Sequence, residues 1–195
     1  MVELFLVRHG YVDFSGKIPG RLKNVHLSER GYEQSKQLVK ILGKKKIDVV
    51  YSSPLERCVE TAKPLCAEYG IPLQLDSLLI ELDYGNWNGK TFESLEHDYE
   101  WKRFHSFRSL TKAPNGESMI SVQNRMITFI EKLKRETPHR RILIVSHNEP
   151  IKSVISYLCG IALDMFLRLS IDPGSISEIR LFQDSAVLKT LNFVV

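Results

Sequence analysis

The chain has 195 residues, of which 43% are hydrophobic, and it carries a formal net charge of +4 at pH 7. This length and composition suffice for a substantial core in one domain spanning residues 1–195. The charge is too small to indicate a nucleic-acid surface, and no window approaches the roughly twenty apolar residues of a membrane span. The N-terminus lacks a basic stretch followed by an apolar signal core, so we expect a cytoplasmic protein.

The three cysteines, Cys58, Cys66 and Cys159, form an odd set without a CxxC pair. This pattern argues against a disulfide framework and against a zinc knuckle. We therefore expect buried, free thiols.

Short apolar runs alternate along the chain with segments of helical periodicity. The apolar runs predict buried parallel strands at 3–7, 47–51 and 142–145. Helical patterns occupy 28–42, 53–69, about 117–136, and a segment from about 150 to just before 160. Near the C-terminal end, "SISEIRLF" and "AVLKTLNF" flank "QDS", which indicates a hairpin at the sheet edge. This order predicts an α/β fold: a three-layer α/β/α sandwich with a mostly parallel central sheet and an antiparallel edge element.

Residues 81–116 fit this alternation less well. The stretch "ELDYGNWNGK" is too rich in glycine and asparagine for a core element, whereas 92–107 predicts an aromatic-bearing helix that lies over another part of the molecule. A long excursion between regular elements is typical of a lid or a binding loop, so we expect a small lid-like insertion here. Its aromatic residues either form a binding wall or simply pack together: Tyr84, Trp87, Trp101 and Phe104.

Charged and imidazole side chains follow the predicted strands directly. The first strand ends in Arg8 and His9, and the third ends in Ser146 and His147. In open α/β sheets, ligands bind beyond the carboxyl ends of the strands. Two histidines are therefore expected at one edge of the sheet, beside at least one guanidinium group.

The segment "YSSPLER" after the second strand adds a second guanidinium group. Ser53 can cap a helix that has Pro54 in its first turn, with Glu56 completing a capping box. Arg57 then lies one turn in, and its side chain leans back toward the helix N-terminus. An arginine and a helix N-terminus thus point to the same place, as an anion site requires.

These residue types favour phosphoryl chemistry over a metal site. Arginine presents a planar fork that matches phosphate oxygens, and a neutral imidazole beside it is a nucleophile or a base. Zinc is disfavoured because the arginines repel a dication and no third ligand lies at a typical spacing. A proton donor for the leaving oxygen is also needed. Glu81 is the candidate because burial can raise a carboxyl pKa toward neutrality, and Asp83 is its rival.

Six ordered blocks span nearly the whole chain: "LVRHG", "HLSERGYEQ", "YSSPLERCVETA", "ELDYGNWNGKT", "PNGES" and "ILIVSHNEPIK". Their order and spacing resemble the histidine phosphatase superfamily, also called phosphoglycerate mutase-like. The resemblance implies that His9 is the nucleophile that forms a phosphohistidine, and that Arg8, Arg57 and His147 make the phosphate pocket. It further implies that Glu81 donates a proton to the leaving group and then activates water. It calls for no metal and no organic cofactor.

The chain departs from the common pattern of this family at several positions. Tyr11 and Ser15 stand where many relatives carry Glu or Gln and Asn, and Asn148 stands in place of a glycine. The common Gln-Gly pair is replaced by Gly20 and Arg21. Ser15, Arg21 and Asn148 are therefore candidate substrate-binding residues, whereas Tyr11 could equally pack.

The resemblance implies a phosphomonoesterase that acts on a small phosphorylated metabolite. Two alternatives stay open: phosphoglycerate-mutase-type phosphoryl transfer, and a phospho-ligand binding module without turnover. The family's blocks are shared by α-ribazole phosphatases and by broad-specificity members, so they name no substrate. We expect no nucleic-acid or membrane partner, and an edge strand could pair across a homodimer.

Overall fold

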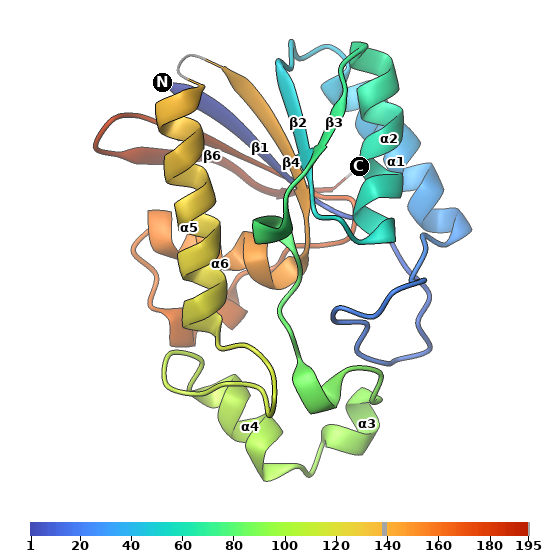
Figure 1. Cartoon of the computed structure of the whole chain (residues 1–195), viewed down its shortest axis with the longest axis vertical. Helices are drawn as coiled ribbons and strands as arrows, with labels where there is room; N and C mark the ends of the chain where they lie inside the picture. The colour runs from blue at the N-terminus through green and yellow to red at the C-terminus, as the bar shows by residue number, and fades with distance from the viewer. Residues whose placement is uncertain (138–139, 195) are drawn as a thin grey trace.

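The computed structural model describes residues 1–137 and 140–194 of the chain. Their centre is one six-stranded sheet with the strand order β3-β2-β4-β1-β5-β6 (Figure 1). The strands are β1 (Val2–Arg8), β2 (Val49–Ser52), β3 (Leu73–Leu75), β4 (Arg141–Ser146), β5 (Ile176–Leu181) and β6 (Ala186–Phe193).

The sheet is mostly parallel. Strand β1 pairs in parallel with β4, β4 with β2, and β2 with β3. Strand β5 runs antiparallel to β1, and β6 returns antiparallel to β5 as the second strand of a hairpin. The predicted sheet with an antiparallel edge element is thereby confirmed. The homodimer expected from such an edge stays a prediction.

Helices cover both faces of the sheet, as the predicted sandwich requires (Figure 1). One face carries α1 (Glu29–Leu42) and α2 (Glu56–Tyr69), and the other carries α5 (Met119–Glu136) and α6 (Asn148–Leu158). The reason lies in β1, whose successive side chains point to opposite faces. Leu4 and Leu6 enter the apolar cluster under α5 and α6, whereas Phe5 and Val7 enter the cluster under α1 and α2.

Residues 81–116 lie away from the sheet, at the bottom of Figure 1. The single helix expected at 92–107 is wrong: the segment forms α3 (Phe92–Leu95) and α4 (Tyr99–Ser106). The side chain of Asp98 caps α4 by accepting a hydrogen bond from the Trp101 amide, so a new helix begins there. The described part of the chain also contains the short 3₁₀ turns η1 (Ser77–Leu79), η2 (Gly85–Trp87) and η3 (Leu163–Arg168).

The expected start of the second helix is also wrong. Helix α2 begins at Glu56, and its N-cap Leu55 makes no side-chain cap bond. The Ser53 hydroxyl instead accepts a weak bond from the Leu55 amide, at 3.4 Å, and also bonds to His147. The Ser53 hydroxyl thus bonds to a residue that is distant in the sequence and does not cap α2.

Smaller differences concern other bounds and the thiols. Helix α5 begins after its N-cap Ser118, α6 begins at Asn148, and strand β3 was not expected. Cys58 is buried, Cys66 is half-buried and Cys159 is exposed, so buried thiols were wrongly expected at the last position.

Within the described ranges, no helix combines the length and the apolar character needed to cross a membrane.

Candidate active site

The ends of three neighbouring strands meet at one edge of the sheet. Arg8 lies opposite Ser146 in the parallel pairing of β1 with β4. The backbone pairing continues one residue further, because the His9 amide donates to the Ser146 carbonyl at 3.0 Å. On the other side of β4, the Ser53 amide donates to the Val145 carbonyl at 3.0 Å. The polar residues after each strand are thus brought to one place.

His9 is held in one orientation by the loop that follows it. Its Nδ1 lies 2.8 Å from the carbonyl oxygen of Gly10. A carbonyl only accepts, so Nδ1 carries the proton and Nε2 keeps its lone pair. The Gly10 amide donates to the Thr61 hydroxyl at 3.0 Å, and a Cβ on Gly10 would lie 2.6 Å from the Gly31 carbonyl oxygen. Only glycine allows this close approach to α1, which fixes the imidazole ring.

The surroundings of His9 keep it neutral. The residue is 4% exposed, and burial, together with the charges of Arg57 and Arg8, lowers its pKa well below the usual value. The His147 ring stands edge-on to it, with 5.2 Å between the ring centroids. Burial and Arg57 lower the pKa of His147 as well. A neutral imidazole with a free Nε2 is the form that can attack an electrophile.

Both arginines carry buried donor groups that are only partly used. Nη1 of Arg8 donates to the Ile171 carbonyl at 2.6 Å, and Nη2 of Arg57 donates to the Gly20 carbonyl at 2.7 Å. Nε of Arg8, and Nε and Nη1 of Arg57, have no hydrogen-bond partner among the described residues. Unpaired buried donors are costly, so an anion that accepts from them would be bound favourably.

The second histidine is anchored from α2 and from the strand before it. Nε2 of His147 lies 2.8 Å from the Ser53 hydroxyl and 3.4 Å from the Cys58 sulfur. Burial raises the pKa of the Cys58 thiol to about 12, so the sulfur stays protonated. Because His147 is neutral and fully buried, it contributes hydrogen bonding at this site without adding charge.

The Glu81 carboxyl group of the site has a strongly raised pKa. It is 8% exposed, and one oxygen accepts from the Leu82 amide at 2.9 Å. Burial, assisted by the nearby charge of Glu149, raises its pKa to about 7. Its rival Asp83 instead accepts from the Gly85 amide at 2.9 Å and from Asn88 at 3.2 Å, which fixes the turn.

A cavity of about 390 Å³ opens in front of these groups. Its lining comes from the 11–20 loop, from five residues between 84 and 108, and from the start of α6, among others. Arg57 and His147 are fully buried behind the cavity lining. Besides Arg8 and His9, the lining comprises residues 11–20, Glu81, Tyr84, Phe92, Trp101, His105, Arg108, Asn148, Glu149, Lys152 and Leu167. Of the aromatic residues considered above, Tyr84 and Trp101 line the cavity, whereas Trp87 and Phe104 are buried.

The three candidate substrate-binding residues lie in different places. Ser15 is exposed at the cavity wall with a positive φ of 51°, and Asn148 lines the cavity at the start of α6. Arg21 does not line it. Its Nε donates to the backbone carbonyl of Glu81 at 2.7 Å, and its Nη2 pairs with Glu117 at 2.6 Å. The guanidinium group therefore holds the backbone that carries Glu81.

Several charged residues of the site were not anticipated from the sequence. Arg125 bonds to the Glu81 carbonyl at 3.2 Å, and Arg108, Glu149 and Lys152 line the cavity. A signal existed for two of them, because 149 and 152 are one turn apart on the helix after "VSH". Arg108 carried no comparable signal, since it lies in an irregular segment.

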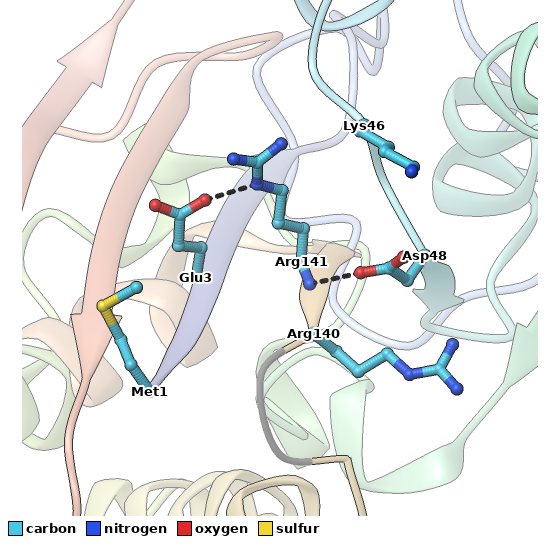
Figure 2. A pocket seen from close by; sticks show the side chains of 6 residues that line it. All are labelled: Met1, Glu3, Lys46, Asp48, Arg140 and Arg141. Atoms are coloured by element: carbon cyan, nitrogen blue, oxygen red, sulfur yellow. Dashed lines mark hydrogen bonds and ion pairs between the residues drawn. The ribbon is translucent and has the colours of Figure 1, made fainter.

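A second hollow lies at the opposite end of the sheet, at the start of β1 and β4 (Figure 2). Two interactions join its lining residues: Arg141 pairs with Glu3 at 2.6 Å, and the Arg141 amide donates to Asp48 at 2.8 Å. Among the described residues that line it, none carries an imidazole or a thiol. The lining residues are Met1, Glu3, Lys46, Asp48, Arg140 and Arg141.

In the part of the chain that the structure describes, no three His, Cys, Asp or Glu side chains are grouped to hold a metal ion.

Comparison with known proteins identifies relatives of this arrangement. The family model described as "Histidine phosphatase superfamily (branch 1)" matches residues 4–194. Phosphoserine phosphatase 1 of Hydrogenobacter thermophilus is 32% identical over 98% of this chain and 92% of its own length. The adenosylcobalamin/alpha-ribazole phosphatase of Escherichia coli is 28% identical, with 98% and 96% covered. The structure of a mycobacterial glucosyl-3-phosphoglycerate phosphatase complexed with VO3 matches with a TM-score of 0.89 at 26% identity, covering 98% of each chain.

Proposed function

Because the chain belongs to the histidine phosphatase superfamily, we propose that it hydrolyses a small phosphorylated metabolite through a covalent phosphohistidine on His9. The observation that carries this proposal is the bond from His9 Nδ1 to the Gly10 carbonyl, which leaves Nε2 unprotonated beside two arginines. The relatives named above are phosphatases of different small metabolites, which supports the substrate class.

In the first step, the Nε2 lone pair of His9 forms a bond to phosphorus while the bond from phosphorus to the ester oxygen breaks. The protonated Glu81 carboxyl donates its proton to the leaving oxygen. The ring gains positive character as the bond forms, and the Gly10 carbonyl stabilises it by accepting from Nδ1. A pKa of about 7 leaves a substantial fraction of Glu81 protonated at neutral pH.

In the second step, the Glu81 carboxylate takes a proton from water, and the water oxygen attacks phosphorus. The nitrogen–phosphorus bond breaks, so His9 returns to its neutral form and phosphate is released. Arg8 and Arg57 are proposed to stabilise the charge on the transferring group, since their unpaired donors suit phosphate oxygens. His147 is proposed to contribute a hydrogen bond from the same side.

The remaining candidates are assigned supporting roles within this proposal. Ser15 and Asn148 are proposed to contact substrate from the cavity wall. Arg21 is proposed as a positioning residue, because it bonds to the backbone of Glu81 and not to the cavity. The 81–116 segment is proposed as the lid-like part of this domain.

The test is to trap the intermediate. Wild type mixed briefly with p-nitrophenyl phosphate and denatured in alkali should carry an acid-labile phosphate on His9, found by peptide mass spectrometry. His9→Ala should lose both the label and the turnover, while His97→Ala, a substitution of an exposed histidine, should keep both. EDTA should have no effect. Turnover by His9→Ala, or a requirement for added metal, would refute the mechanism; phosphoglycerate isomerisation faster than phosphate release would favour the mutase alternative.

A further inference from the structure

The outer part of the same cavity carries charges that the phosphoryl transfer does not use. Arg108 is 1% exposed and Glu149 is 5% exposed, and they form an ion pair of 3.0 Å between Nη1 and Oε2. The Arg108 guanidinium also stacks 4.4 Å from the Phe104 ring. The second oxygen of Glu149 accepts from Asn148 at 3.2 Å. The Glu149 carboxylate is therefore satisfied at both oxygens, and its charge is balanced.

Lys152 is a buried cation of the cavity outside this ion pair, whereas Lys17, which also lines the cavity, is exposed. Lys152 follows Glu149 by one turn of α6, lines the cavity and is 8% exposed. Within the described ranges, its Nζ makes no hydrogen bond or ion pair, and its aromatic contact is the Phe166 ring at 5.7 Å. Burial lowers the pKa of Lys152, although the charge of Glu149 acts in the opposite direction. A buried ammonium without a partner is costly, so a group that enters the cavity with negative charge would stabilise it.

The cavity that Lys152 shares with the proposed nucleophile His9 limits the size of the negatively charged group. Lys152 lies five residues beyond His147, a rise of about 7.5 Å along the helix. The His147 ring lies 5.2 Å from the ring of His9. Lys152 and His9 line the same cavity of about 390 Å³, so a small substrate with its phosphoryl group at His9 can carry a negative group toward the ammonium.

We propose that Lys152 forms a carboxylate subsite, so that the substrate is a short phosphorylated carboxylic acid. A carboxylate fits better than a second phosphoryl group, because one buried ammonium balances one negative charge and the charge of Arg108 is already balanced by Glu149. The inference rests on the proposed function, since it places the phosphoryl group at His9.

The experiment compares 3-phosphoglycerate with glycerol 3-phosphate, which replaces the carboxylate by a hydroxymethyl group. Wild type should prefer 3-phosphoglycerate by about tenfold or more in kcat/KM, as expected for one charge-assisted contact. In Lys152→Met, kcat/KM should fall about tenfold more for 3-phosphoglycerate than for glycerol 3-phosphate. Lys152→Arg should restore part of the preference. Lys63→Met, a substitution of an exposed lysine on α2, should leave the ratio at the wild-type value.

Three outcomes would contradict the proposed carboxylate subsite. Equal turnover of the two substrates by wild type, turnover of neither, or a preference that survives Lys152→Met would each do so. If Lys152→Met fails to fold, Lys152→Gln replaces it in the same comparison, with the same expected loss of the preference. Failure of the proposed function is recognised separately, because p-nitrophenyl phosphate would then not be hydrolysed in a His9-dependent way.

Discussion

Replacing Glu81 by Gln is expected to make the protein more stable at alkaline pH. The wild-type carboxyl group is buried, and its pKa is raised to about 7 in the folded state from an ordinary value of 4.5. The folded state therefore binds this proton more tightly than the unfolded state does. Its contribution to stability is present at low pH and is lost as the pH rises through 7. Gln cannot ionise, and its carbonyl oxygen can still accept from the Leu82 amide.

The size of the effect follows from the two pKa values. Their difference, 7 minus 4.5, corresponds to about 3 kcal/mol when the folded carboxylate is fully ionised. At about pH 5 part of the loss has already occurred, because the unfolded carboxyl is then largely ionised. Between about pH 5 and pH 8.5, the stability of Glu81→Gln relative to wild type should therefore rise by about 2 to 3 kcal/mol.

Urea unfolding at these two pH values measures the difference. Contributions from other titrating groups are common to both proteins and cancel, and Glu93→Gln, at an exposed position, should show no pH-dependent gain. Glu81→Gln should also slow hydrolysis of alkyl phosphates by about 10²–10⁴-fold. It should slow p-nitrophenyl phosphate much less, because that leaving group needs no proton. A stability difference that is the same at both pH values would refute the argument from burial.

Three further perturbations test the packing and charge of the fold. Arg108→Ala should lower the free energy of unfolding by about 3–5 kcal/mol, since it leaves the Glu149 carboxylate buried without its partner; a loss below about 1 kcal/mol would contradict the buried pair. Phe129→Ala, at a core position 1% exposed, should cost about 3–5 kcal/mol in urea unfolding, and a loss typical of surface sites would contradict its packing. Wild-type stability should fall below about pH 6.5, because the folded state lowers the pKa of His9 and His147 and the unfolded state then binds more protons. His147→Asn should make this decline shallower in thermal melts, and an unchanged slope would contradict it.

Local sequence pattern determined much of the fold. The apolar runs that became β1 and β4 are short and rich in Val, Ile and Leu, as is typical of buried parallel strands. Parallel pairing then brings Arg8 and Ser146 side by side. This pairing is why the polar residues after each strand could be expected at one edge. Similarly, the buried positions of α1 recur at helical spacing, so the buried face of this helix follows from its own periodicity. These positions are Gly31, Ser35, Leu38 and Leu42.

The two helices of the aromatic segment after Thr91 could not be predicted from the local pattern. Its composition suited one helix, but Asp98 caps a second helix, and Trp101 packs on Trp87 with 5.1 Å between the rings. A cap and a ring contact depend on which neighbours lie nearby, and periodicity carries no such information.

The sequence by itself determined which polar residues follow each strand, because an apolar run and the residues directly after it are local properties of the chain. Tertiary structure alone decided that Ser53 bonds to His147 instead of capping α2, and that Arg21 holds the backbone of Glu81. It also decided that Lys152 lines the cavity with no hydrogen bond or ion pair to any residue that the structure describes. Each of these outcomes depends on polar groups from distant segments competing for the same hydrogen bond or charge, and that competition takes place only when the chain is folded.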